Sequence, residues 1–209
     1  MRRRRPSKGT NVDVLLRDLY GSLHEGSGFE QPLRTLATAF RSHLSGLHHQ
    51  DFDTGHGSLT IVGSLSSSDY LEFNEAYSQR WNGQNLWMER SLDGFLSQGY
   101  QHGDAVVTPA ELEASPYYRN FLKPLDIRYG LGISIGRPDS GDVAVASFHR
   151  DQGDAGFGDE DIALVETLRP HLVNVNSIIR RIAGPGTRCC TPPNGIQAHA
   201  IHRTRGNRI

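Results

Sequence analysis

The chain has 209 residues, a hydrophobic content of 36% and a mean hydropathy of −0.49, which suits one domain of ordinary size with part of the chain left outside its core. Its formal net charge is −1 and its two cysteines are adjacent, so the composition excludes a disulfide framework. The sequence contains no apolar run of about 18 residues and no export signal, and we expect a cytoplasmic protein without a membrane span.

Basic residues gather at both ends of the chain. Residues 1–10 carry five of them and residues 184–209 carry four, with no acidic residue in either segment. Removing these nine leaves 13 basic against 23 acidic residues, so the middle carries a charge of about −10. Lys and Arg supply most non-specific affinity for DNA, so direct DNA binding by the middle is not expected. We interpret both ends as disordered basic tails.

Two amphipathic helices are predicted first. Apolar residues recur at helical spacing over 12–23 and again over 29–44, and Gly46 is expected to end the second helix. Alternation then changes to that of strands over 47–65, with a turn at Asp53-Thr54-Gly55.

The middle of the chain combines a third helix, over 68–81, with a short segment at 85–90 and irregular chain over 95–107. Thr108 before Pro109 predicts a capped helix. Ser115-Pro116 predicts a second short helix that ends near Leu122.

A strand pair and a long helix complete the pattern. The strands are predicted over 129–136 and 143–149, around the turn residues 139–142. Apolar residues from Ile162 to Ile182 step by three or four, with acidic residues in the first turn and Arg180-Arg181 in the last. Pro170 is expected to kink this helix. The order of elements predicts an α+β domain in which helices flank an antiparallel sheet.

Several segments resemble a known family. They are Phe121-Leu122-Lys123-Pro124-Leu125, Gly130-Leu131-Gly132, Phe148-His149-Arg150, Gly156-Phe157 and Leu168-Arg169-Pro170-His171-Leu172. Together they resemble the GAF/PAS-like N-terminal sensory module of LuxR-type helix-turn-helix transcriptional regulators. The resemblance implies a small-molecule pocket between the sheet and the middle segment. The match to the autoinducer-binding type is poor, so an acyl-homoserine lactone ligand is not implied.

The C-terminal end departs from that family pattern, because no helix-turn-helix is recognised after Arg181. We therefore expect a sensory domain over 11–183 in a truncated regulator. The tail at 184–209 joins Pro and Gly to scattered Arg without periodicity, as a sequence read out of frame does. Translation of the downstream DNA in all frames would test this expectation.

Aromatic residues in the middle of the chain are the candidates for a ligand pocket. With Asn85 as a polar group, they are predicted to line an apolar site: Trp81, Asn85, Trp87, Tyr118, Phe121 and Tyr129. The alternative is that each of them belongs to the core.

Histidines supply the weaker candidates. The stretch from His48 to His56 offers possible metal ligands but matches no zinc spacing, and a solvated strand face is the preferred interpretation. His149 and His171 are interpreted as structural or surface groups, and Gly130-Leu131-Gly132 is a poor nucleotide-binding signal because it lies within a strand. We expect no metal, no cofactor and no enzyme activity, with a metal-dependent enzyme as the remote alternative.

Two functions therefore remain open. The first is the sensory domain of a LuxR-type regulator that binds a small ligand or a partner protein and signals through its final helix. The second is a dimerisation module that pairs with intact regulators, as a homodimer or heterodimer through that same helix.

Overall fold

A five-stranded antiparallel sheet forms the centre of the computed structural model, which describes residues 11–25, 29–51, 57–63, 67–136 and 142–183. Its strands are β1 (Leu44–Asp51), β2 (Gly57–Gly63), β3 (Tyr100–His102), β4 (Tyr129–Ser134) and β5 (Asp142–Arg150). They lie in the order β2-β1-β5-β4-β3. Strands β1 and β5 are therefore central neighbours although about 100 residues separate them in the chain.

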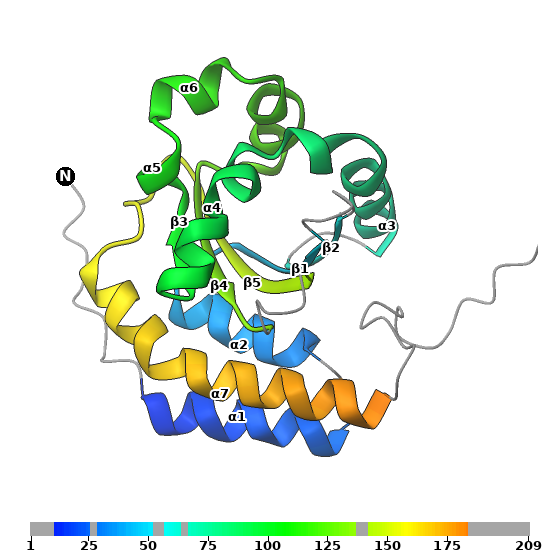
Figure 1. Ribbon diagram of the computed structural model, residues 1–209, viewed down its shortest axis with the longest axis vertical. Helices are drawn as coiled ribbons and strands as arrows, with labels where there is room; N and C mark the ends of the chain where they lie inside the picture. The colour runs from blue at the N-terminus through cyan, green and yellow to red at the C-terminus, as the bar shows by residue number, and fades with distance from the viewer. Residues whose placement is uncertain (1–10, 26–28, 52–56, 64–66, 137–141, 184–209) are drawn as a thin grey trace, which may run out of the picture.

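Three helices cover one face of this sheet: α1 (Val12–Glu25), α2 (Glu30–Ala39) and α7 (Asp159–Ala183). Figure 1 shows α7 beside α1, with α2 between them and the sheet. Their apolar stripes pack on alternate residues of the strands, including Ile133 of β4 and Phe148 of β5. The ring of Phe148 lies 4.7 Å from that of Phe40, so this face holds the main hydrophobic core.

The other face is covered by the middle of the chain (Figure 1). The elements are α3 (Ser67–Ala76), the π-helical turn η1 (Tyr77–Trp81), the 3-10 turn η2 (Asn82–Gln84), α4 (Leu86–Ser97), α5 (Gly103–Val106), α6 (Pro109–Ala114), the π-helical turn η3 (Tyr118–Leu122) and the 3-10 turn η4 (Lys123–Leu125). A second apolar cluster, rich in aromatic rings, fills this layer. The α+β class with helices on an antiparallel sheet and a long last helix is confirmed.

Side-chain caps explain where two of the short helices begin. The Thr108 hydroxyl accepts a hydrogen bond from the Glu111 amide at 3.3 Å, with Pro109 in the first turn of α6. The Ser115 hydroxyl accepts one from the Tyr118 amide at 3.0 Å. Both starts were predicted from the sequence, because a hydroxyl before proline satisfies an otherwise unpaired amide.

The predicted boundaries of the second helix and the first strand were wrong. Helix α2 ends at Ala39, Arg41 follows with φ 52°, and Leu44 begins β1. Gly46 is a strand residue that pairs with both Ile61 and Ser147. The apolar spacing continues past the helix because Leu44 is buried in the second apolar cluster, so periodicity alone did not show the change of element.

Helix α4 was also missed, since only a short segment at 85–90 and irregular chain from 95 were predicted. The Asn85 side chain caps this helix by accepting a hydrogen bond from the Met88 amide at 3.2 Å. Gly94 lies within this helix, where a Cβ atom would overlap the Gln101 side chain on the neighbouring strand.

The predicted turn residues 53–55 and 139–141 and the two predicted tails lie outside the described residues. Helix α7 runs unbroken through Pro170. Within the part of the chain that the structure describes, no helix has the length and apolar character needed to cross a membrane.

Candidate ligand-binding site

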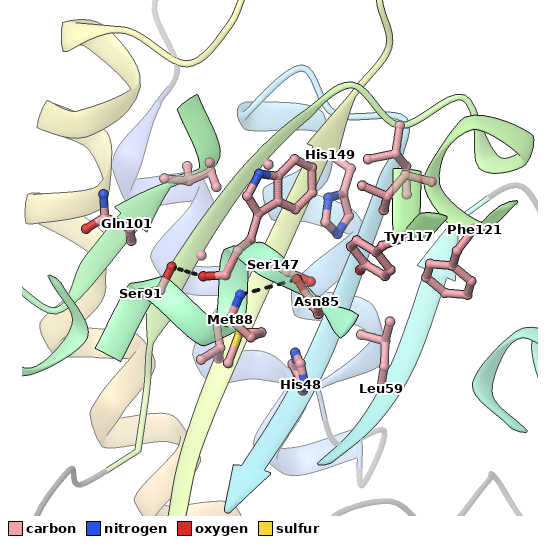
Figure 2. A pocket seen from close by; sticks show the side chains of 18 of the residues that line it. His48, Leu59, Asn85, Met88, Ser91, Gln101, Tyr117, Phe121, Ser147 and His149 are labelled. Atoms are coloured by element: carbon pink, nitrogen blue, oxygen red, sulfur yellow. Dashed lines mark hydrogen bonds between the residues drawn. The ribbon is translucent and has the colours of Figure 1, made fainter. Parts of the chain in front are cut away.

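A cavity lies between the sheet and the layer formed by α4 and η3 (Figure 2). The volume of the cavity that is open to the centre of a water molecule is about 60 Å³. A single buried water needs roughly 10–15 Å³ of such volume. Its lining is mainly apolar and consists of His48, Leu59, Asn85, Trp87, Met88, Ser91, Phe95, Gln101, Gly103, Tyr117, Phe121, Leu122, Ile127, Gly130, Leu131, Gly132, Val145, Ser147 and His149. The cavity therefore has room for several waters or one small molecule.

Strand alternation decides which sheet residues reach this cavity. On β5, Val145, Ser147 and His149 line it, whereas their neighbours Ala146 and Phe148 belong to the core under the terminal helices. The cavity and helix α7 therefore lie on opposite faces of the same strands.

Glycines on the sheet make room for large rings from α4. A Cβ atom at Gly130 would lie 2.9 Å from the Trp87 ring, and one at Gly132 would lie 3.0 Å from the Phe95 ring. Trp87, Ser91 and Phe95 follow one another at intervals of four along α4 and all line the cavity. The Gly130-Leu131-Gly132 segment thus serves ring packing within a strand.

A buried hydrogen-bonded trio joins three elements at the cavity wall. The Tyr77 hydroxyl lies 3.0 Å from His48 Nε2 and accepts a hydrogen bond of 3.0 Å from Asn85 Nδ2. Burial raises the pKa of Tyr77, an effect that the hydrogen bond from Asn85 partly offsets, so the phenol stays protonated. The interpretation of His48 as part of a solvated face was wrong, because its side chain is 4% exposed. Alternation alone left open which face of β1 is buried.

His149 lies at the other end of the cavity and stacks on Trp87, with ring centroids 6.3 Å apart and planes at 16°. Burial, together with the nearby His43 and His48, lowers the pKa of His149 from 6.5 to about 3. The imidazole is therefore neutral at physiological pH. Its Nδ1 and the Nε1 of Trp87 are buried without a hydrogen-bond partner among the described residues.

Three of the six predicted pocket residues line the cavity, namely Asn85, Trp87 and Phe121. Trp81 lies behind them, 6.1 Å from the Phe121 ring. Tyr118 is buried in the second apolar cluster, and its place in the lining is taken by Tyr117, because positions 117 and 121 share one helical face.

Tyr129, the sixth predicted residue, lies at the beginning of β4 under the Arg128 guanidinium, which is 4.8 Å from its ring centroid. It does not line the cavity. His48 and His149 also line the cavity and were not predicted to, and neither were Met88, Ser91 and Phe95, because α4 was not recognised. The interval of four between Trp87, Ser91 and Phe95 was the available signal.

The histidines do not assemble a metal site within the described ranges, where no group of three or more His, Cys, Asp or Glu side chains could hold an ion. His171 lies on α7, on the other face of the sheet, with its Nδ1 3.1 Å from the Tyr20 hydroxyl. Tyr20 also accepts a hydrogen bond from Asn174, so His171 links α1 to α7.

Comparison with known proteins supports the fold. Neither a family model nor a curated protein sequence matches the chain. Among solved structures, the chain is similar to the VqsR LBD domain from Pseudomonas aeruginosa, with a TM-score of 0.56 and 18% identity over 78% of this chain and 94% of that one. The chain and that domain therefore share a fold.

Two further solved structures have a fold similar to that of this chain. One is the N-acylhomoserine lactone dependent LuxR family transcription factor CepR2 from Burkholderia cenocepacia, with a TM-score of 0.52 and 16% identity over 82% of this chain and 97% of that one. The other is SdiA in complex with octanoyl-rac-glycerol, with a TM-score of 0.53 and 14% identity over 90% of this chain and 70% of that one. The predicted resemblance to the sensory modules of LuxR-type regulators is confirmed at the level of the fold.

Proposed function

We propose that this chain is the sensory domain of a LuxR-type transcriptional regulator and binds a small molecule in the cavity between the sheet and α4. The cavity carries the proposal, since it combines an apolar lining with a few convergent polar side chains, as ligand sites do. The fold of the LBD domain of VqsR supports the same function. The alternative function is that the chain binds a partner protein instead of a small molecule.

The strands offer a direct route from the cavity to helix α7. Leu131 of β4 lines the cavity and also belongs to the core on which α7 packs. Beyond it, Arg169 of α7 donates a hydrogen bond of 3.1 Å to the Ser134 carbonyl, and Asn176 donates one of 3.0 Å to the Ile135 carbonyl. A ligand that shifts β4 would change these contacts and so move α7.

The two tryptophans of the chain provide the test. In a broad metabolite screen, we expect the ligand to quench tryptophan fluorescence in the wild type and in Trp81→Phe. The quenching should be lost in Trp87→Phe, because Trp87 lines the cavity and Trp81 does not. A chain that responds to no metabolite but binds a protein would instead favour the partner-binding function. Quenching that survives only in Trp87→Phe would place the ligand elsewhere.

A dimer through α7 is the second function that a specific observation favours. Ile182, in the last turn of α7, is 73% exposed. It continues the apolar spacing of three and four residues along this helix, so it is the position at which a paired helix would contact α7. We expect Ile182→Glu to weaken self-association at least about tenfold, the effect of roughly 1.4 kcal/mol, in light scattering over a concentration series.

Leu96 on α4 is the matched control, because its side chain is 53% exposed on a different surface. Leu96→Glu should leave self-association unchanged. A wild-type chain that remains monomeric at the highest concentration would remove the dimer proposal.

A further inference from the structure

One side chain of α7 reaches the layer that covers the cavity. Gly99 lies in the turn between α4 and β3, and a Cβ atom at that position would overlap the guanidinium of Arg169. The Arg169 side chain therefore packs directly on the backbone of this turn. Because β3 is the three-residue strand at the edge of the sheet, a side chain of α7 can pass around it. Figure 1 shows the end of α4 beside the first half of α7.

This turn continues the helix that forms one wall of the cavity. Trp87, Ser91 and Phe95 line the cavity at intervals of four along α4, and Gly99 follows four residues after Phe95. The Gly99 amide donates a hydrogen bond of 3.0 Å to the Gly94 carbonyl. Gly99 has φ 82°, the left-handed conformation that glycine adopts after the end of a helix. The turn is thus tied to the last residues of α4, so a displacement of α4 displaces Gly99 as well.

Few bonds hold Arg169 in this place. Its Nε donates one hydrogen bond of 3.1 Å to the Ser134 carbonyl, and the Ser134 amide donates one of 2.8 Å to the Gly99 carbonyl. Arg169 forms no ion pair with any residue that the structure describes. The buried Arg150, by comparison, makes five hydrogen bonds, one of them to Asp161. Arg150 therefore suits an anchor, whereas the contact of Arg169 can open at low cost.

We propose that Arg169 couples the cavity to α7: a molecule that displaces α4 moves the Gly99 turn, and the guanidinium then leaves the Ser134 carbonyl and loosens α7 from the sheet. This inference rests on the proposed function, in which a ligand in the cavity is signalled through α7. It differs from the route through β4 because the signal passes around the edge of the sheet. Leu168 and Leu172, close to this position on α7, are buried in the core, so a change at Arg169 reaches the packed side of the helix.

Ser91→Leu tests this coupling without a ligand. Ser91 lines the cavity, and leucine there adds apolar volume between α4 and the sheet, as an occupant would, while it favours the helix. Hydrogen exchange of the Arg169 Nε–H and of the α7 amides is measured by NMR relative to the amides of α2, so that a change in overall stability cancels. We expect Ser91→Leu to speed exchange at both places by about tenfold, a usual strength of coupling between two sites.

Three further variants separate the routes. Arg169→Met removes the guanidinium and identifies its signal, and in this background Ser91→Leu should change the exchange of α7 by less than about twofold, as for independent sites. Asn176→Leu removes the bond to the Ile135 carbonyl at similar side-chain volume, and in it the response should persist. Leu96→Ala changes an exposed residue of α4, so it is the matched control for Ser91→Leu and should leave α7 unchanged.

A response of α7 that survives in Arg169→Met would mean that the signal passes through β4, and the inference would be overturned while the proposed function is unaffected. An α7 that does not respond to Ser91→Leu in the wild-type background would overturn the inference as well. Ligand binding is decided separately, by the quenching of tryptophan fluorescence. If Ser91→Leu does not fold, Ser91→Val repeats the measurement with less added volume.

Discussion

Arg150→Met is expected to lower the free energy of unfolding by about 3 kcal/mol, the lower end of the usual cost of removing one partner of a buried ion pair, because Arg41 remains beside Asp161. The Arg150 side chain is 3% exposed and its Nη2 lies 2.7 Å from Asp161 Oδ1, in a carboxylate that is 6% exposed. Methionine preserves much of the side-chain length and apolar stem. The loss would therefore report on the guanidinium rather than on an emptied volume.

The guanidinium joins three segments of the chain. It donates two hydrogen bonds to the Phe40 carbonyl after α2, at 2.7 and 3.0 Å. It also donates to the carbonyls of Ala155 and Gly156, at 3.2 and 2.9 Å. Asp161 in turn accepts a hydrogen bond from the Gly158 amide at the start of α7. Removing Arg150 takes the shortest hydrogen bonds from these buried carbonyls, and it leaves Asp161 with the more exposed Arg41, 3.3 Å away, as its remaining ion-pair partner.

Urea denaturation of Arg150→Met and of Glu30→Gln measures this effect. Glu30 forms an ion pair of 2.9 Å with Arg34, but both side chains are more than 40% exposed, so its loss should cost less than about 1 kcal/mol. If the two variants lose similar amounts, the Arg150 pair does not hold the beginning of α7 in place. A similar loss in Asp161→Asn would support the pair as the cause.

The sequence predicted the elements whose signals are local. Thr108 and Ser115 begin helices through their own hydroxyl groups, and the spacing in α7 follows the apolar stripe that packs on the sheet. These features depend on residues within four positions of one another. Helix α4 was not predicted, and one of its residues, Gly94, lies against Gln101 on the neighbouring strand, a contact that local spacing does not contain.

The candidate site was predictable only in part for the same reason. Aromatic residues near one another in the chain indicated the region of the cavity, and Asn85, Trp87 and Phe121 line it. His48 and His149 come from strands that lie about 100 residues apart in the chain. Whether a strand residue faces the cavity or the terminal helices depends on which layer covers each face, and alternation does not specify that.

The second large effect expected is a dependence of stability on pH that comes from His149. In the folded chain, burial and the nearby His43 and His48 lower the pKa of this imidazole from 6.5 to about 3. In the unfolded chain it takes up a proton near pH 6.5. Between these values the unfolded state binds more protons, so the free energy of unfolding falls as the pH falls. Above pH 6.5 both states are neutral and the contribution is complete.

His149→Gln removes this titration while keeping a polar side chain of similar size. At pH 8 the difference in stability between the two chains reflects packing alone, because the imidazole is neutral in both states. Between pH 8 and pH 5 the wild type should lose about 2 kcal/mol more than His149→Gln, since each pH unit below 6.5 costs about 1.4 kcal/mol. Urea denaturation at both pH values measures this change.

Carboxylates and the other histidines contribute to both chains and largely cancel in the comparison, so only the difference between the two pH profiles carries information about His149. Parallel profiles would mean that the imidazole can become charged in the folded chain, through water that enters the cavity and hydrates it. In that case the cavity would tolerate a positive charge at the position of His149. The expected divergence below pH 6.5 therefore tests, without any ligand, whether the cavity keeps the His149 imidazole neutral.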